Sequence, residues 1–280
     1  MARSRVLKHS NVWMEEKENQ GKFSWTLALY GTPAMAKEAG MSEKAYWQQI
    51  INACYLDKKD PVGTWRKVQA EIRRVAQKLN DLNIDSIRIE APGTDLTVGF
   101  HPKHKWIGGT GRNIPSFEVF TSPDWRRTEG VSTFTEPLFR YGNKASGIKL
   151  TFKAGKVVQV EAKTGKDWLT KMIAEEGADK IGEISLTDGR LSRITKYMGE
   201  TLFDENVGGK YGNTHLALGK AYKDCFRGDP SKVSKEEWDK MGYNDSAVHT
   251  DIVATSNRTV TATLQNGKKQ VIYKNGKFTI

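Results

Sequence analysis

The short stretch VHTDI, residues 248–252, places two metal-binding types of side chain, His249 and Asp251, two positions apart. The apolar residues around them are typical of a β-strand, and in a strand residues i and i+2 point to the same face. An imidazole and a carboxylate on one face can bind a divalent cation together, but such a pair also occurs as an ordinary polar face. A metal site therefore needs further ligands from elsewhere in the chain.

Candidate acids stand where predicted elements end. Glu118 lies in a short run that a proline turn ends, and Glu183 follows a predicted helix and enters an apolar run. The glycine- and asparagine-rich stretch 201–222 carries the remaining candidates, which are Asp204, Glu205, His215 and Tyr222. Taken singly, each acid is more often a surface carboxylate, and His215 could equally be a half-buried histidine. Carboxylates with one or two histidines suit ions of borderline hardness such as Zn²⁺, Mn²⁺ or Co²⁺.

Other hydrolytic or redox chemistries find no support in the sequence. The histidines are His9, His101, His104, His215 and His249. They form no H-E-x-x-H motif, and no Ser, His and Asp triad is evident. The cysteines Cys54 and Cys225 lack the paired spacing of a thiolate metal site, and two are too few for a disulfide framework. Together with the lack of a secretory signal or a membrane span, this predicts a cytoplasmic protein.

The charge balance, 44 basic against 33 acidic residues, is that of a basic protein. The basic residues are dispersed along the chain, without a helix-turn-helix, a Cys/His finger or an arginine-rich tail. Dispersed lysine and arginine are more often a solvated surface than a nucleic-acid groove. We therefore expect no specific nucleic-acid partner. A nucleic-acid-binding protein or a two-metal nuclease remains the least favoured alternative.

Five segments occur in this order: NIPSFEVFTSP, IGEISL, LFDEN, THLALGKAY and SAVHTDIV. Together they resemble the M29 family of metallopeptidases, of the thermophilic aminopeptidase T type. The resemblance extends upstream, to segments that precede the catalytic part of the family's sequences. These segments are SWTLALYGTPAMAKEAGMS, ACYLDKKDPVGTW and APGTDLTV, so the resemblance runs from about Ser24 to the C-terminus. It implies an aminopeptidase that hydrolyses N-terminal residues from peptides, two divalent metal ions (Zn, Co, Mn or Mg) and a homodimer.

The resemblance also implies roles for particular residues. The metal ligands would be Glu118, Glu183, Glu205, His215, His249 and Asp251. Glu183 would also bridge the ions or assist the attacking water, and Tyr222 would donate a hydrogen bond to the oxyanion. Four carboxylates would balance the charge of two divalent cations, whereas the same cluster without cations would repel itself and take up protons.

Family members are longer and begin with a separate α/β domain. We therefore expect residues 1–23 to be a remnant of that domain and residues 24–280 to form the catalytic domain, with its metal-binding part at 111–280. An aminopeptidase is the favoured function. The main alternative is a truncated remnant that binds metal but is catalytically weak or inactive.

The sequence pattern predicts an α+β fold to position these residues, with helices first and a β-rich body after them. We expect a strand at 24–31, a helix from Ser42 to about Cys54, and a longer helix that begins at Asp60 and Pro61. The longer helix has an apolar stripe of Val62, Trp65, Val68, Ile72, Val75, Leu79 and Leu82. GIKLTFKAGKVVQVEAK and NRTVTATLQNGKKQVIYKNGKF predict hairpins, and KDWLTKMIAEEGA predicts a helix between them.

Overall fold

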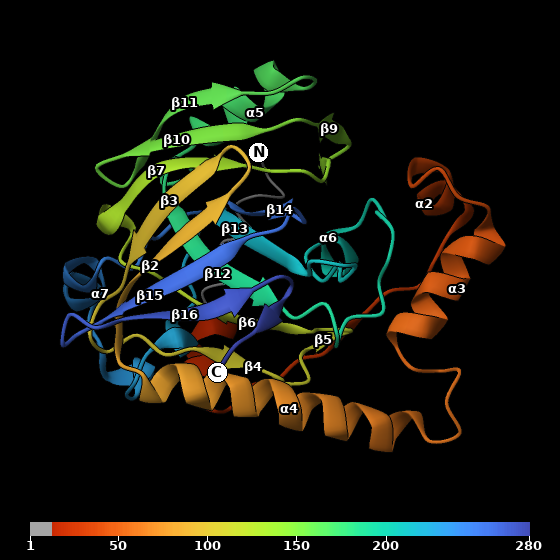
Figure 1. Cartoon of the computed structure of the whole chain (residues 1–280), viewed down its shortest axis with the longest axis horizontal. Coiled ribbons are helices and arrows are strands. Elements are labelled where there is room, and N and C mark those ends of the chain that lie inside the picture. The colour runs from red at the N-terminus through yellow and green to blue at the C-terminus, as the bar shows by residue number, and fades with distance from the viewer. Residues whose placement is uncertain (1–12) are drawn as a thin grey trace.

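Two antiparallel sheets form the body of the protein in the computed structural model, which describes residues 13–280 (Figure 1). In spatial order, the larger sheet consists of β11 (Lys156–Glu161), β10 (Lys149–Lys153), β7 (Thr128–Thr133), β3 (Thr94–Gly99), β2 (Ile84–Ala91), β15 (Thr259–Leu264), β16 (Lys269–Lys274) and β17 (Lys277–Phe278). The smaller sheet consists of β14 (His249–Ala254), β13 (Asn213–Gly219), β12 (Ile181–Thr187), β6 (Glu118–Thr121) and β4 (Ile107–Gly108).

Helices and short strands flank these sheets. Among the α-helices are α2 (Pro33–Glu38), α3 (Glu43–Ala53), α4 (Pro61–Asp81), α5 (Lys166–Ile173), α6 (Thr201–Asp204) and α7 (Lys235–Met241). Short 3-10 turns form η1 (Trp125–Arg127), η2 (Lys223–Cys225) and η3 (Pro230–Lys232). Small two-stranded sheets pair β1 (Leu27–Ala28) with β5 (Asn113–Ile114) and β8 (Leu138–Arg140) with β9 (Asn143–Ala145). The predicted α+β class is confirmed.

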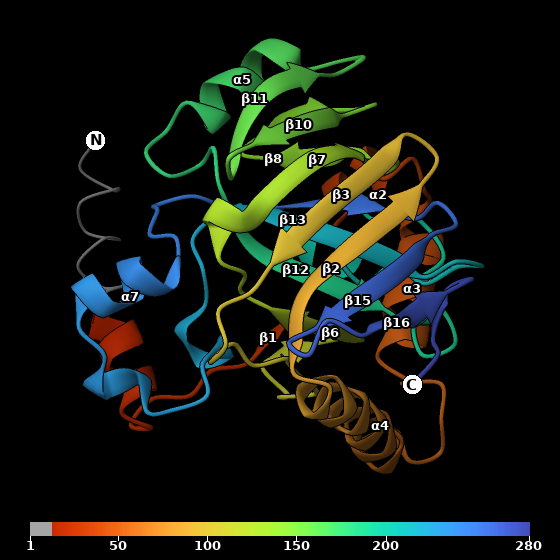
Figure 2. The same cartoon turned by 60° about the vertical axis from the view of Figure 1, so that its left-hand side comes forward.

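The two large sheets pack face to face, with the smaller sheet behind β2 and β3 in Figure 2. Inward residues of the larger sheet, such as Ile87 and Leu96, share one core with Ile184 and Leu216 of the smaller sheet. Because strand side chains alternate, each smaller-sheet strand has a second face directed away from this core. The strands β12 and β13 are buried along their whole length, so that second face is also covered by protein.

The predicted helices after residue 40 form where the capping residues indicate. The Ser42 hydroxyl accepts a hydrogen bond from the amide of Ala45 at the start of α3. The Asp60 carboxylate accepts one from the amide of Gly63, and Pro61 takes the first position of α4. The predicted hairpins β10–β11 and β15–β16 are present as well.

Two details of the prediction are wrong. The expected strand at 24–31 is reduced to Leu27–Ala28, which pairs with β5 alone and has exposed side chains. The apolar stripe of α4 does not reach its first turn, because Val62 is 61% exposed whereas Ile72 and Leu79 are fully buried. The reason is that α4 packs on β4 and β6 with its later turns, while its start extends beyond the sheet (Figure 1).

Helices α2 and α3 form a second core with the segment 191–207, apart from the sandwich core. The Tyr46 hydroxyl donates a hydrogen bond to the carbonyl of Met198, and Tyr55 donates one to the carbonyl of Leu191. These contacts fix the segment that leads into α6 and the LFDEN motif. No helix among residues 13–280 is both long and apolar enough to cross a membrane.

Candidate metal centre

Five predicted ligands come from four adjacent strands of the smaller sheet. In the order β6, β12, β13 and β14, these residues are Glu118, Glu183, His215, and the pair His249 and Asp251. They share one face because His215 stands opposite Ser185, two residues after Glu183, and Asp251 stands opposite Ala217, two residues after His215. This face points away from the sandwich core.

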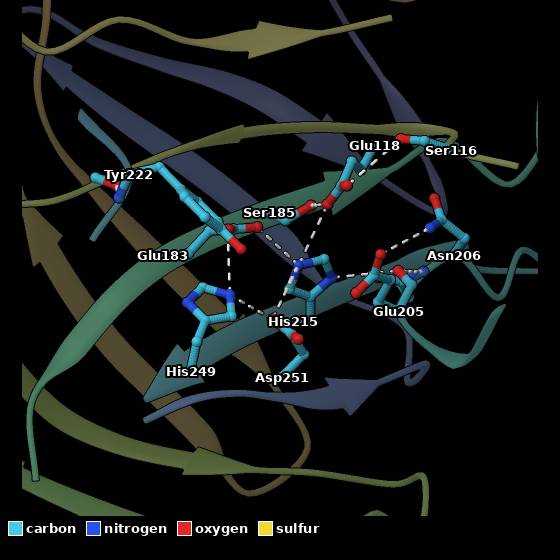
Figure 3. Close-up of polar contacts among 12 residues, drawn as sticks. Ser116, Glu118, Glu183, Ser185, Glu205, Asn206, His215, Tyr222, His249 and Asp251 are labelled. Carbon is cyan, nitrogen blue, oxygen red and sulfur yellow. Dashed lines mark hydrogen bonds and ion pairs between the residues drawn. The ribbon is translucent and has the colours of Figure 1, made fainter. Parts of the chain in front are cut away.

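The side chains of these strands converge on one another (Figure 3). The Nε2 atom of His215 lies 3.0 Å from Glu183 Oε1, 3.3 Å from Glu118 Oε2 and 3.9 Å from Asp251 Oδ1. The Nε2 atom of His249 lies 3.3 Å from Asp251 Oδ1 and 3.7 Å from Glu183 Oε2. The contacts define a compact cluster in which Glu183 lies between the two imidazoles.

Two sets of three side chains could each bind a cation. In each set, one ligand atom from every residue lies within 4.8 Å of the others. The sets are Glu118, Glu183 and His215, and Glu183, His249 and Asp251. Glu183 belongs to both sets, which is the arrangement expected of a carboxylate shared by two ions.

Both histidines are oriented as metal ligands usually are. The Nδ1 atom of His215 lies 3.2 Å from the carbonyl oxygen of Glu205, and that of His249 lies 2.8 Å from the carbonyl oxygen of Lys220. A carbonyl only accepts hydrogen bonds, so Nδ1 carries the proton in each ring. The Nε2 atoms therefore face the carboxylates, and a backbone partner fixes each ring in the pattern common for metal-bound histidines.

Glu205, the sixth predicted ligand, lies at the edge of the cluster, directly after α6. Its Oε1 atom is 3.4 Å from the side-chain amides of Asn113 and Asn206, and it belongs to neither three-residue set. Its neighbour Asp204 has a structural role instead. The Asp204 carboxylate accepts hydrogen bonds from the backbone amides of Met198 and Glu200, which closes the loop before α6.

Tyr222 lies beside the cluster, in the segment that follows β13. Its ring centroid is 4.7 Å from that of His249, and its backbone amide donates a hydrogen bond to Ser122 Oγ. The side chain is 39% exposed, so it borders both the cluster and the solvent. Burial of the hydroxyl and the negative charges of Glu183 and Asp251 raise the pKa of Tyr222 well above its usual value. Tyr222 therefore keeps its proton and can donate it in a hydrogen bond.

Burial and neighbouring charges shift the pKa values of the carboxylates in the cluster. Burial, followed by the negative charge of Glu183, raises the pKa of Glu118 to about 7 against the opposing effect of His215. Burial and the charges of Glu118 and Asp251 raise the pKa of Glu205 well above its usual value. Asp251 differs, because the charges of His249, His215 and Arg140 and the hydrogen bond from His249 together outweigh burial and lower its pKa to about 2.

The histidines show the converse effect. Burial lowers the pKa of each ring, but the interactions with the surrounding groups together outweigh burial. Glu183, Glu118 and Asp251 act on His215, and Asp251, Glu183 and the Lys220 carbonyl act on His249. The net result is a pKa of about 9 for both histidines. In the metal-free protein, the protons on the two histidines thus supply positive charge that balances the nearby carboxylates. The same donor set, buried and rich in carboxylate and imidazole, fits divalent cations in place of those protons.

Several supporting residues were missed by the sequence analysis. The Ser185 hydroxyl donates a hydrogen bond to Glu118 Oε2 at 2.9 Å, and the side-chain Oδ1 of Asn206 accepts one from the backbone amide of Phe117 at 2.6 Å. Arg140 donates to the carbonyl oxygen of His249 at 2.9 Å. Ser185 could have been found, because it follows Glu183 by two positions and so shares its face. Arg140 carries no such signal, since only the tertiary fold brings β8 to β14.

One glycine has a direct part in placing Glu183. The pairing of β12 with β13 shifts register between Ile181 and Glu183, so that Gly182 forms a bulge. A Cβ atom on Gly182 would lie 2.3 Å from the carbonyl oxygen of Lys220 and 2.4 Å from that of Gly219. Glycine therefore allows the close approach that turns Glu183 toward the ligands on β13 and β14.

A buried cluster of carboxylates and imidazoles across one sheet face is the donor set expected of a metal-dependent enzyme. The family model described as thermophilic metalloprotease (M29) matches residues 1–278, and the chain belongs to this family.

Characterised relatives agree with this assignment. The chain is 33% identical to aminopeptidase PepS of Streptococcus thermophilus, over 95% of this chain and 68% of that protein. It is 32% identical to aminopeptidase T of Thermus aquaticus, over 92% of this chain and 66% of that protein. The structure of wild-type AmpT from Thermus thermophilus superposes with a TM-score of 0.80 at 27% identity, over 91% of this chain and 65% of that chain. The chain thus spans about two thirds of the length of these relatives.

Proposed function

We propose that this protein is a metal-dependent aminopeptidase that hydrolyses N-terminal residues from peptides. The observation that carries the proposal is the shared position of Glu183, which lies in both three-residue sets of metal-binding atoms. Membership of a metallopeptidase family and the aminopeptidase activity named for its relatives support the same function. We assign the catalytic domain to residues 24–280, with a metal-binding part at 111–280, and expect a cytoplasmic homodimer.

The binding roles follow from the two sets. Glu118 and His215 would hold one divalent cation, His249 and Asp251 would hold the other, and Glu183 would contact both. We retain Glu205 as the sixth ligand because the negative charges of Glu118 and Asp251 raise the pKa of its carboxylate, which indicates that it lies close to them. Zn²⁺, Co²⁺, Mn²⁺ and Mg²⁺ are the candidate ions, and the two imidazoles favour the first three.

When bound, a pair of divalent cations would lower the pKa of a coordinated water and polarise the scissile carbonyl. The chain supplies the remaining chemistry. Tyr222, protonated and beside His249, would donate a hydrogen bond to the oxygen on which negative charge develops. Glu183 would hold the attacking water in place by accepting its hydrogen bond. A carboxylate or a cation of the site would also bind the free amino terminus of a peptide, which selects cleavage at the N-terminus.

The proposal is tested by titrating the chelated protein with Zn²⁺ or Co²⁺ and following hydrolysis of an amino-acid chromogenic amide. We expect activity to rise with metal and to saturate, and the melting temperature to rise in parallel because the cations bind the folded state. An N-terminally acetylated amide is the matched control and should not be cleaved. Metal-dependent stability without any hydrolysis would instead identify a metal-binding protein that has lost turnover.

A further inference from the structure

Arg258 is an arginine inside the sandwich core. It precedes β15, and it shares the inward-facing alternation of Val260, Ala262 and Leu264 along that strand. Its exposure is 3%, close to that of Val260 and Ala262, which are fully buried. The guanidinium therefore enters the space between the two sheets, where apolar side chains are the rule.

The protein partners of this guanidinium are neutral. Nη1 donates a hydrogen bond to Thr214 Oγ1 at 3.1 Å, and Nη2 donates one to the carbonyl oxygen of Ser256. Within the described part of the chain, no carboxylate forms a hydrogen bond or an ion pair with Arg258. Burial lowers its pKa to about 10, and only Tyr273 opposes this effect. A pKa of about 10 still leaves Arg258 charged at neutral pH, and a buried charge is costly unless another charge compensates it.

A small cavity of about 10 Å³ adjoins the guanidinium, between the two sheets. Its polar lining comes from both sheets and the loop after β14, and consists of Thr94, Ser132, Thr214, Ser256 and Arg258. Apolar side chains, among them Ile89 and Phe134, complete the wall. This volume suits one water molecule or one monatomic ion of similar size. It is too small for a tetrahedral oxyanion such as phosphate.

We propose that this cavity binds a single small monovalent anion of the halide class, of which chloride is the common representative. The guanidinium of Arg258 supplies the compensating charge, and the hydroxyls of threonine and serine can donate hydrogen bonds to the anion.

The site is separate from the metal centre, because Thr214 and His215 are neighbours on β13 and point to opposite faces of the sheet. A bound anion would connect the larger sheet to the loop after β14. It would therefore stabilise the strand that carries His249 and Asp251.

A thermal denaturation series tests the proposal. The melting temperature would be measured at constant ionic strength while chloride or bromide replaces gluconate, which is too bulky for the cavity. A halide concentration tenfold above its dissociation constant should raise the melting temperature by about 3 °C. Arg258→Met should abolish this response, because it removes the guanidinium and its charge and leaves an unbranched apolar side chain. Arg88→Met, which removes an exposed arginine on β2, should retain it.

Crystals of the parent protein grown with bromide test anion binding in the cavity even if Arg258→Met does not fold. The proposal predicts an anomalous peak beside the guanidinium of Arg258 in the parent protein. Two results would overturn it. One is a cavity that holds only water in bromide, and the other is a melting temperature that does not depend on halide or that responds equally in Arg258→Met.

Discussion

At the scale of single residues, Tyr222 separates an enzyme from a protein that only binds metal. Its ring lies against His249 and is 39% exposed, so it contributes little to the core. We expect Tyr222→Phe to leave metal content and melting temperature near those of the parent. Turnover should fall by about 10²- to 10³-fold, because a donor to the oxyanion acts mainly in the transition state. Steady-state kinetics on a chromogenic amide measure the turnover, and metal analysis and thermal denaturation measure the two properties that should not change.

Tyr30→Phe is the matched control, since Tyr30 is 77% exposed on the loop before α2. It should leave turnover unchanged. Parent-like turnover in Tyr222→Phe would remove the proposed role, although the metal ligands would be unaffected.

The raised pKa of Glu118, about 7, predicts how pH affects metal binding. Cations compete with the proton on this carboxylate, so metal affinity should increase as pH rises from about 5 through 7. Affinity should continue to increase up to about pH 9, because the protons of His215 and His249 must also leave. The metal-free protein should behave oppositely. A group whose pKa is raised on folding contributes stability below its unfolded pKa, and this contribution is lost as pH rises through the folded value. Calorimetric titrations at several pH values, with and without chelator, measure both trends.

Glu118→Gln provides the control, because an amide has no proton to lose in this range. Its residual metal affinity should depend less on pH than that of the parent. An affinity that is equally pH-dependent in Glu118→Gln would assign the titration to other groups, of which His215 and His249 are the first candidates.

At the scale of elements, α4 shows what an apolar stripe can and cannot predict. The period of apolar residues correctly gives the helix and its buried face, but not where the partner sheet ends. Ile72 is fully buried near β4 and β6, whereas Val62 is 61% exposed. We therefore expect Ile72→Ala to lower the free energy of unfolding by about 2–5 kcal/mol. Val62→Ala should change it by less than about 0.5 kcal/mol.

Urea denaturation of the two variants measures both free energies. The pair is well matched, because each substitution shortens an aliphatic β-branched residue on the same helix. Equal losses of stability would mean that the first turn of α4 is covered by protein in solution.

The same distinction holds for the site. Spacing places His249 and Asp251 on one face of a strand, and that local prediction depends only on the two-residue period. The meeting of β6, β12, β13 and β14 depends on strand order and register, which a single sequence does not encode locally. Only the ordered motifs of the family resemblance linked Glu118 to His215. Arg140 and the bulge at Gly182 stayed beyond prediction, because both depend on contacts between distant segments.

At the scale of the whole molecule, a basic protein with a formal net charge of +11 encloses an acidic cluster. Four carboxylates lie together at less than a tenth exposure each, namely Glu118, Glu183, Glu205 and Asp251. Such a concentration of buried acids is costly unless positive charge compensates it. The two histidines supply part of that charge, and divalent cations would supply it in full. The net positive charge therefore does not indicate the function, whereas the buried carboxylates indicate cation binding.

The most direct test of a two-ion metal centre is a crystal structure with Zn²⁺ or Co²⁺, with anomalous scattering measured at the metal's absorption edge. We expect two peaks on the outer face of the smaller sheet. One should lie between Glu118, Glu183 and His215, and the other between Glu183, His249 and Asp251, with Glu183 in contact with both. A saturated crystal with no metal at Glu183, or with a single ion that leaves His215 or His249 hydrogen-bonded to carboxylate, would contradict it.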